Sequence, residues 1–331
     1  MFTIFLHKQT YRLEPRRTET EQNGYKKAFR DAGRLFCQKR GKKMRIGFIG
    51  AGRAGSALAT ALAAAGHQVV AVADRLPEKA QALGEAVGAV TTSAPRVVEE
   101  AETVFLSVPD DVLASLAAEL ALATTGREGK VFFHLSGLHP ARLLRPLAGE
   151  ENLGSLHPLL PLAERKSGAG RLRSCLYTFE GGKKAAAVAQ ELVGSLGGRF
   201  WVIKAEEKPI YHAAAVMASN YMVTLFDVAF SLFGRLGMEG KAAREALWPL
   251  VEATLANLTA LAPEEALTGP ISRGDTETVR THLLHLAKHD EKAAVIYRVL
   301  GGRTVELARR AGRLTEAAAE ELLRLLEGER E

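Results

Sequence analysis

A glycine-rich turn between an apolar run and an alanine-rich run constrains the fold of this sequence most. Residues 45–64 read as a short buried strand followed by a helix, with Gly50-x-Gly52-x-x-Gly55 where the two meet. Gly50 permits the tight turn, Gly52 lets the backbone approach a pyrophosphate, and Gly55 lets helix and strand pack closely. The helix N-terminus adds N–H donors and a positive dipole. The pattern predicts a dinucleotide-binding βαβ unit.

The second strand of this unit separates the motif from an ordinary tight turn. "QVVAVAD" (68–74) ends at Asp74, 19 residues after Gly55, as the motif requires. Asp74 would accept hydrogen bonds from the ribose of NAD, whereas Arg75 would face the 2′-phosphate of NADP. Arg53 adds positive charge, so the sequence favours NADP, with NAD as the alternative. The predicted cofactor-binding residues are Gly50, Ala51, Gly52, Arg53, Ala54, Gly55, Asp74, Arg75, Val108 and Pro109.

Alternating strand and helix patterns continue after this unit and then give way to helices alone. Further strands are expected at 103–109, 130–137, 152–158, 175–182 and 199–203, and helices at 54–65, from Pro77 and at 111–123. Short, continuously apolar strands between helices indicate a parallel sheet covered on both faces. Later helices are expected at 209–235, 239–261, 276–289, 291–311 and 315–328, with a loop at 268–275. We therefore predict a Rossmann-like, doubly wound α/β domain over 44–204 and an all-α domain for substrate binding and dimerisation over 205–331.

The net charge of +6 comes from the N-terminal leader. Residues 1–43 hold 12 of the 44 Lys and Arg residues and 4 of the 38 Asp and Glu residues, so the remaining chain carries −2. This removes the main argument for nucleic-acid binding. The leader lacks the features of a secretory signal, and its acidic residues argue against a transit peptide. We expect an extension upstream of a natural start at Met44, with a flexible basic tail as the alternative.

Composition also bears on the cellular compartment of the protein. Two distant cysteines, Cys37 and Cys175, give neither a disulfide framework nor metal-ligand spacing, which favours a reducing cytoplasm and no metal site. No apolar run approaches the roughly 18 residues that a membrane span needs. We expect a cytoplasmic protein that does not bind a membrane.

The first long C-terminal helix carries a polar stripe that suits reduction chemistry. At 100° per residue, Lys208, His212 and Ser219 fall within about 40° of one another, and Asn220 lies about 120° from Lys208. Reduction of a carbonyl or imine needs a proton donor and positive charge near the reacting heteroatom. Lys208 would supply both, with its pKa lowered by a dry site, and His212 would orient or share the proton. The alternative is a structural role, with the His and Ser satisfied in the core and Lys208 solvated.

Three loop segments would face the same cleft. Ser136 lies in "HLSG" (134–137), which follows a strand, and His157 lies in "SLHP" (155–158), which ends the next strand. Such sheets bind ligands beyond the carboxyl ends of their strands. Ser136 would bond the nicotinamide amide or the substrate, and His157 would lie near the nicotinamide. Arg273 in the loop at 268–275 would bind a substrate carboxylate. The alternatives are a plain connection around His157 and a solvated interhelical turn with an Arg–Asp pair.

Several motifs together resemble a bacterial family that pairs a Rossmann-like domain with a C-terminal domain of unknown function. These motifs are "GAGRAGSALA", "SVPDD", "HLSG", "GSLHPL", "YHAAAVMASNY" and "LTGPISRGDTETVRTHL". The resemblance covers residues 44 to about 311. The family is similar in architecture to the superfamily of 6-phosphogluconate dehydrogenase, 3-hydroxyisobutyrate dehydrogenase, ketopantoate reductase and pyrroline-5-carboxylate reductase.

The resemblance implies a fold, a nicotinamide cofactor and a dimer. Several superfamily enzymes place a catalytic Lys at a helix start with an Asn or His one turn later, and Lys208 and His212 match that spacing. Ser136 and Gly137 match a serine- or glycine-rich segment loosely. By likeness to pyrroline-5-carboxylate reductase, the loop at 268–275 would come from a partner subunit. Prephenate dehydrogenase, a more distant relative, has a His-Pro loop near its nicotinamide that is similar to the one at His157.

These observations predict an NAD(P)-dependent oxidoreductase that acts on a small carbonyl, imine or hydroxy acid. The expected catalytic residues are Lys208, His212, Ser136, His157, Ser219, Asn220 and Arg273. We expect a homodimer through the C-terminal helices and a small-molecule substrate. The alternative from another class is a non-catalytic NAD(P)-binding sensor, which needs the glycine loop but no proton donor.

Overall fold

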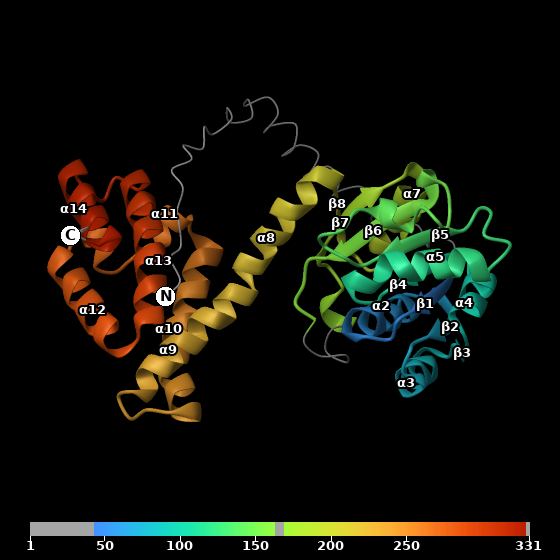
Figure 1. Cartoon of the computed structure of the whole chain (residues 1–331), viewed down its shortest axis with the longest axis horizontal. Helices are drawn as coiled ribbons and strands as arrows, with labels where there is room; N and C mark the ends of the chain where they lie inside the picture. Colours follow the sequence, from blue (N-terminus) through green and yellow to red (C-terminus); the bar gives the residue numbers. More distant parts are fainter. Residues whose placement is uncertain (1–42, 163–168, 329–331) are drawn as a thin grey trace. The chain divides into compact units, whose positions relative to one another are not determined.

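The computed structural model describes residues 43–162 and 169–328 (Figure 1). These residues form two compact units, the first ending at Ser219 and the second beginning at Asn220. The sequence placed the domain boundary between residues 204 and 205, so helix α8 (Lys208–Ala218) is the element on which the two divisions differ. Predictions about residues 1–42 lie outside the described residues.

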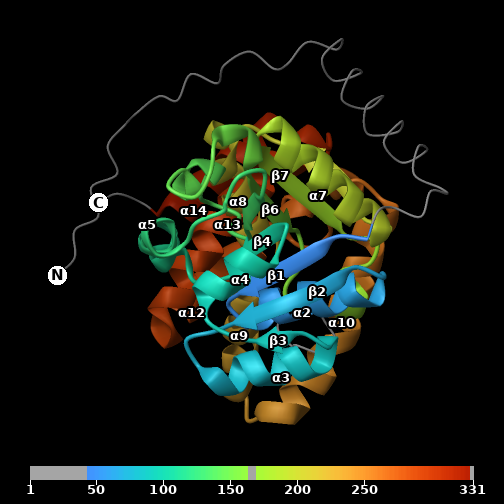
Figure 2. The same ribbon diagram turned by 90° about the vertical axis from the view of Figure 1, so that its right-hand side faces the viewer.

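The first unit is built on one eight-stranded sheet with the order β3-β2-β1-β4-β5-β6-β7-β8. The strands are β1 (Arg45–Ile49), β2 (Gln68–Ala73), β3 (Val90–Thr91), β4 (Thr103–Leu106), β5 (Val131–His134), β6 (Leu153–Pro158), β7 (Leu176–Gly181) and β8 (Arg199–Val202). Figure 2 shows β3, β2, β1 and β4 side by side. The predicted doubly wound sheet is confirmed, with one exception: β7 runs antiparallel to β6, while the other pairs are parallel.

Helices cover both faces of this sheet. One core contains α2 (Arg53–Ala64), α3 (Pro77–Val87) and α7 (Lys183–Ser195), and the other contains α4 (Ala94–Glu100) and α5 (Leu113–Ala123). Strand residues alternate between these cores, as the period of two requires. The sequence reading missed α4, α7 and the two-residue strand β3.

The second unit is helical among the residues that the structure describes. It contains α9 (Asn220–Gly234), α10 (Gly240–Ala260), α11 (Pro263–Ala266), α12 (Thr276–His289), α13 (Glu291–Arg310) and α14 (Glu316–Glu327). The expected loop at 268–275 also holds a short 3-10 turn, η5 (Ile271–Arg273). The single helix expected over 209–235 is interrupted at Ser219, where φ is −123° and ψ is −69°.

The stretch Ala205–Gly234 corrects the expectation about apolar length. It is long and apolar enough to cross a membrane by length and composition alone, with a mean hydropathy of 1.4. Within it, α9 contains no buried residue. The sequence reading overlooked this stretch because isolated polar residues interrupt its apolar run.

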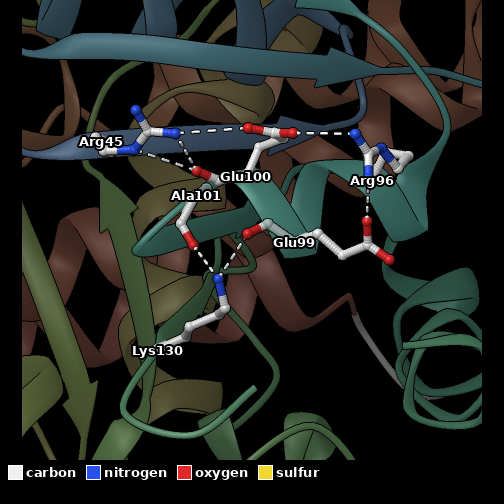
Figure 3. Close-up of polar contacts among 6 residues, drawn as sticks. All are labelled: Arg45, Arg96, Glu99, Glu100, Ala101 and Lys130. Atoms are coloured by element: carbon white, nitrogen blue, oxygen red, sulfur yellow. Dashed lines mark hydrogen bonds and ion pairs between the residues drawn. The ribbon is translucent and has the colours of Figure 1, made fainter. Parts of the chain in front are cut away.

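A polar network lies where β1 begins and the segment after α4 enters β4 (Figure 3). The Arg45 guanidinium donates to the Glu100 carbonyl oxygen, and the Lys130 ammonium donates to the carbonyl oxygens of Glu99 and Ala101. Arg96 pairs with the carboxylates of Glu99 and Glu100. Solvent screens such exposed ion pairs, so the hydrogen bonds to backbone carbonyl oxygens contribute most to the stability of this network.

Candidate active site

The glycine loop between β1 and α2 has the shape of a phosphate cradle. Gly50 has a φ of +103°, and a Cβ on Gly55 would lie 2.2 Å from the Ser107 hydroxyl oxygen. A Cβ on Gly52 would meet nothing within 4 Å, so the space beside the N-cap of α2 is open. No side chain caps that helix end. The loop therefore fits a dinucleotide pyrophosphate, which backbone N–H groups and the helix dipole would hold.

Asp74 is bound to the glycine loop. Its carboxylate accepts hydrogen bonds from the Ala51 backbone N–H at 2.6 Å and from the Leu76 N–H at 2.8 Å. Both carboxylate oxygens therefore bind backbone N–H groups, one in the glycine loop and one after β2. Arg75 and Arg53 are exposed. The structure thus gives Asp74 a supporting contact that the sequence did not predict.

Val108 and Pro109 follow β4 at the same edge of the sheet. The Val108 side chain would lie 3.1 Å from a Cβ on Gly50, so it lines the glycine loop. Pro109 precedes the 3-10 turn η1 (Asp110–Val112). Ala54 lies in the first turn of α2 and is half-buried. These residues lie around the glycine loop, and their roles in cofactor binding stay predictions.

Lys208, the first residue of α8, lies at the carboxyl ends of β5 and β6. Its side chain is only 1% exposed, and its ammonium donates to the Ser136 carbonyl oxygen at 3.1 Å and to Ser155 Oγ at 2.8 Å. Burial lowers the pKa of Lys208 to about 8, although the charges of Glu180 and Asp110 act to raise it. A desolvated cation is therefore fixed at the edge of the sheet where a nicotinamide would lie.

Ser136 organises the turn after β5. Its hydroxyl donates to Asp110 Oδ2 at 2.8 Å and accepts from the backbone N–H groups of Leu138 and His139. The Ser136 carbonyl oxygen also accepts from Ser155 Oγ at 3.0 Å. The hydroxyl hydrogen is thus engaged within the protein, and the carbonyl helps to hold Lys208.

His157 and His212 converge beside Gly137. A Cβ on Gly137 would lie 2.6 Å from His212 Nδ1 and 3.1 Å from His157 Nε2, so only glycine leaves room for both rings. The ring centroids are 6.1 Å apart. Tyr211 contacts His157 from the other side, with its hydroxyl oxygen 2.7 Å from Nδ1. Burial, followed by the charges of Lys208 and His212, lowers the pKa of His157 to about 4.

The cluster does not include every predicted catalytic residue. Ser219 ends α8, where its backbone N–H bonds the carbonyl oxygens of Ala215 and Val216. Asn220 and Arg273 belong to the second unit and are exposed. In the loop at 268–275, Asp275 caps α12 through the backbone N–H of Thr278. The roles predicted for Ser219, Asn220 and Arg273 stay predictions.

The sequence reading overlooked Tyr211, Ser155 and Asp110. Ser155 lies two residues before His157 on β6, so the two share a face of the strand. Tyr211 lies three residues after Lys208, within reach of the same helix face. Both spacings were visible, but neither indicates a partner without knowledge of the register between α8 and the sheet.

Comparison with known families accounts for both parts of the chain. Residues 32–158 match a Rossmann-like domain, and residues 175–304 match DUF2520, a domain of unknown function. The chain pairs a Rossmann-like domain with a DUF2520 domain. The DUF2520 match begins in the sheet and includes β8, so it extends beyond the expected helical part. Ser136 and His157 come from the Rossmann-like part and Lys208, Tyr211 and His212 from DUF2520, so the cluster needs both.

Several known proteins of similar fold are reductases or oxidoreductases by name. A Bacteroides fragilis protein named "putative NADP oxidoreductase" is 22% identical, with a TM-score of 0.65 over 82% of this chain and 99% of that one. Plasmodium falciparum pyrroline carboxylate reductase with NADP bound is 15% identical, with a TM-score of 0.54 over 85% and 98%. A Mycobacterium tuberculosis pyrroline-5-carboxylate reductase is 38% identical over 86 residues, 25% of this chain and 29% of that protein. The chain therefore matches less than a third of the length of that relative.

Proposed function

We propose that this protein is an NAD(P)H-dependent reductase of a small compound with a C=O or C=N bond. One observation carries the proposal: the glycine cradle after β1 and the cluster after β5 and β6 lie at the same carboxyl edge of one sheet. Ligands of such sheets bind at this edge. A reduced nicotinamide bound there supplies a hydride to the carbon of the double bond. The names of the proteins that share this fold, which include reductases and an imine reductase, support this reaction class.

The residues of the cluster meet the needs of this reaction. As the hydride arrives, the π electrons of the double bond move to the heteroatom, which then takes a proton. Lys208 supplies fixed positive charge, which a dry site makes more effective than it would be in water. Its lowered pKa, about 8, also makes it an acid suited to neutral pH. Ser136 and Ser155 position Lys208, while His157 and His212 present polar ring atoms beside Gly137.

NADP is the cofactor that the geometry favours. The Asp74 carboxylate is already engaged by two backbone N–H groups, which reduces its capacity to bind a ribose hydroxyl. Arg75 and Arg53 are exposed, and their guanidinium groups suit a 2′-phosphate. The proposal therefore includes NADP in preference to NAD.

Thermal unfolding of the full chain with NAD+, NADH, NADP+ and NADPH tests the cofactor. A ligand that binds only the native state stabilises it by about 2.7 kcal/mol at a hundredfold excess over Kd. We expect the largest shift with the NADP pair, followed by oxidation of NADPH in a screen of cyclic imines and ketones. No shift with any nucleotide would contradict the proposal. Cofactor binding without turnover of any carbonyl or imine would favour a cofactor sensor.

We further propose that the protein acts as a cytoplasmic homodimer in which α9 and α10 of two copies pack together. α9 buries no residue and α10 buries only Ala243, while large apolar side chains such as Val223 and Leu250 are each 66% exposed. Light scattering should give the mass of a dimer for the wild type and of a monomer for Leu250→Glu. Leu122→Glu on α5, where the leucine is 92% exposed, is the matched control. Binding of the wild type to lipid vesicles as a monomer would contradict the dimer.

A further inference from the structure

The contact between Tyr211 and His157 determines which nitrogen of the imidazole carries its hydrogen. The phenol oxygen lies 2.7 Å from Nδ1, with the two rings nearly perpendicular at 84°. A phenol O–H is a much stronger acid than a neutral imidazole N–H, and an unprotonated ring nitrogen is the stronger acceptor. The favoured bond therefore runs from the Tyr211 hydroxyl to Nδ1. A neutral ring that accepts at Nδ1 carries its hydrogen on Nε2.

The surroundings of His157 keep its ring neutral. α8 presents Lys208, Tyr211 and His212 to it. The Thr178 hydroxyl on β7 lies within hydrogen-bond reach of the His157 carbonyl oxygen and of the Tyr211 phenol oxygen, so the phenol can accept from Thr178 while it donates to Nδ1. Burial, followed by the charge of Lys208 and the neighbouring His212, disfavours a second proton, which lowers the pKa of His157 to about 4. At neutral pH the ring is therefore uncharged.

The Nε2 atom of His157 faces Gly137. It is 3.1 Å from the point where a Cβ on Gly137 would lie. Gly137 follows β5 and His157 lies near the end of β6, at the carboxyl edge that also carries the glycine loop. A ligand at this edge would thus meet an N–H donor on an uncharged ring.

We propose that Tyr211 is a positioning residue that holds His157 as the neutral Nε2–H tautomer, so that the site takes substrates whose reacting heteroatom keeps a free lone pair. The inference rests on the proposed reductase function. A carbonyl oxygen and a neutral imine nitrogen both have such a lone pair, whereas an N-alkylated iminium ion has none. The hydrogen bond strengthens as electrons gather on the heteroatom, which favours the transition state over the bound substrate.

Nuclear magnetic resonance of the full chain with 15N-labelled histidine tests the tautomer without any turnover. The His157 ring signals are assigned by their loss in His157→Gln. We expect a protonated Nε2 and an unprotonated Nδ1 in the wild type at neutral pH, and a mixture of tautomers in Tyr211→Phe. Tyr297→Phe removes the phenol that contacts His282 and should leave the His157 signals unchanged. A wild-type His157 protonated on Nδ1 would overturn the inference, whether or not Tyr211→Phe folds.

Three substrates test the consequence for recognition: cyclohexanone, 2-methyl-1-pyrroline at a pH above the pKa of its nitrogen, and the N-methylated pyrrolinium ion. With NADPH, we expect kcat/KM for the N-methylated ion to be lower than for the neutral imine by about tenfold, the worth of one hydrogen bond. Tyr211→Phe should narrow that gap. Equal rates for the two would overturn the inference and leave the proposed function intact. No reduction of any carbonyl or imine would overturn the proposed function, and the ring signals would still decide the tautomer.

Discussion

Two tyrosine–histidine pairs in this chain have nearly the same geometry but different surroundings. His157 and Tyr211 have Nδ1 and hydroxyl oxygen 2.7 Å apart, with ring centroids at 5.7 Å and planes at 84°. For His282 and Tyr297 the corresponding values are 2.9 Å, 5.7 Å and 89°. The first pair joins α8 to β6, and Tyr211 is buried. The second joins α12 to α13, and His282 is exposed.

The difference shows that contact geometry alone does not make a site. Lys208 and His212 act on His157, and Gly137 lets both imidazoles approach its backbone. In the second pair Tyr297 packs against the core of the helical unit, but His282 is exposed, so water screens charges and supplies hydrogen bonds at its ring. Burial lowers the pKa of His157, and the Lys208 charge acts on this ring more strongly because water is excluded around it.

The strongest test of this comparison removes the charge beside His157. Lys208→Met should lower kcat/KM by about 100- to 1,000-fold, the typical loss of one electrostatic group in a dry site. The variant should fold, because Ser155 Oγ still donates to the Ser136 carbonyl oxygen. Lys130→Met is the matched control, since Lys130 also binds backbone carbonyls but lies in the network of Figure 3. Equal losses in the two variants would mean that Lys208 has only a structural role.

Acid should destabilise the first unit through its neutral histidines. The folded-state pKa values of His157 and His134 are lowered to about 4 and about 3, mainly by burial, from an unfolded value of 6.5. The unfolded chain therefore binds more protons between pH 6.5 and 3, and the stabilising contribution present above pH 6.5 is lost as pH falls. His157 alone accounts for about 3 kcal/mol by pH 4. Urea unfolding across this range should show a weaker pH dependence in His157→Gln than in the wild type.

Replacing each histidine of the two pairs compares them directly. His157→Gln should lower kcat/KM by about 10- to 100-fold, because the glutamine amide places its N–H at a different position from that of imidazole Nε2. His282→Gln should leave kcat/KM unchanged. Steady-state kinetics of both variants, with NADPH and one carbonyl or imine that the wild type reduces, measure the difference. Loss of activity in His282→Gln would show that the second pair also takes part.

The smallest effect is expected from closing the space beside the first pair. Gly137→Ala should cost about 1–3 kcal/mol of unfolding free energy, because the new methyl group displaces the two imidazoles or the turn. Activity should fall with it. Gly149→Ala is the control, since a Cβ there meets nothing within 4 Å and its φ is −65°. Thermal melting and kcat/KM of both variants check this. A Gly137→Ala protein with unchanged kinetics would show that the two imidazoles accommodate the added methyl group.

The sequence predicted the glycine loop better than the side-chain cluster around Lys208 and His157. The glycine loop depends on residues within one strand, turn and helix, so its conformation follows from local sequence. Most strands of the first unit were also visible, because buried parallel strands are short, continuously apolar runs, whereas α4, α7 and the short strand β3 were missed. The strand β7 was expected, but its antiparallel direction was not, since a strand does not show its direction in its own sequence.

Lys208 and His212 were found on one helix stripe, but their environment was not. Lys208 reaches Ser136 and Ser155 across 72 and 53 residues of chain, and His157 reaches Tyr211 across 54. Spacing along α8 placed the polar groups on one face. It gave no indication that Lys208 would be covered or that Tyr211 would bond His157.

The sequence by itself therefore determined the dinucleotide cradle, the class of sheet and the candidate proton donors. Their identities follow from local backbone geometry and from residue types. Only the tertiary structure decided that Asp74 binds the glycine loop, that Lys208 is desolvated and that His157 is held by Tyr211. Those properties depend on which distant segments exclude water from a side chain, and burial sets both its charge and its hydrogen-bond partners.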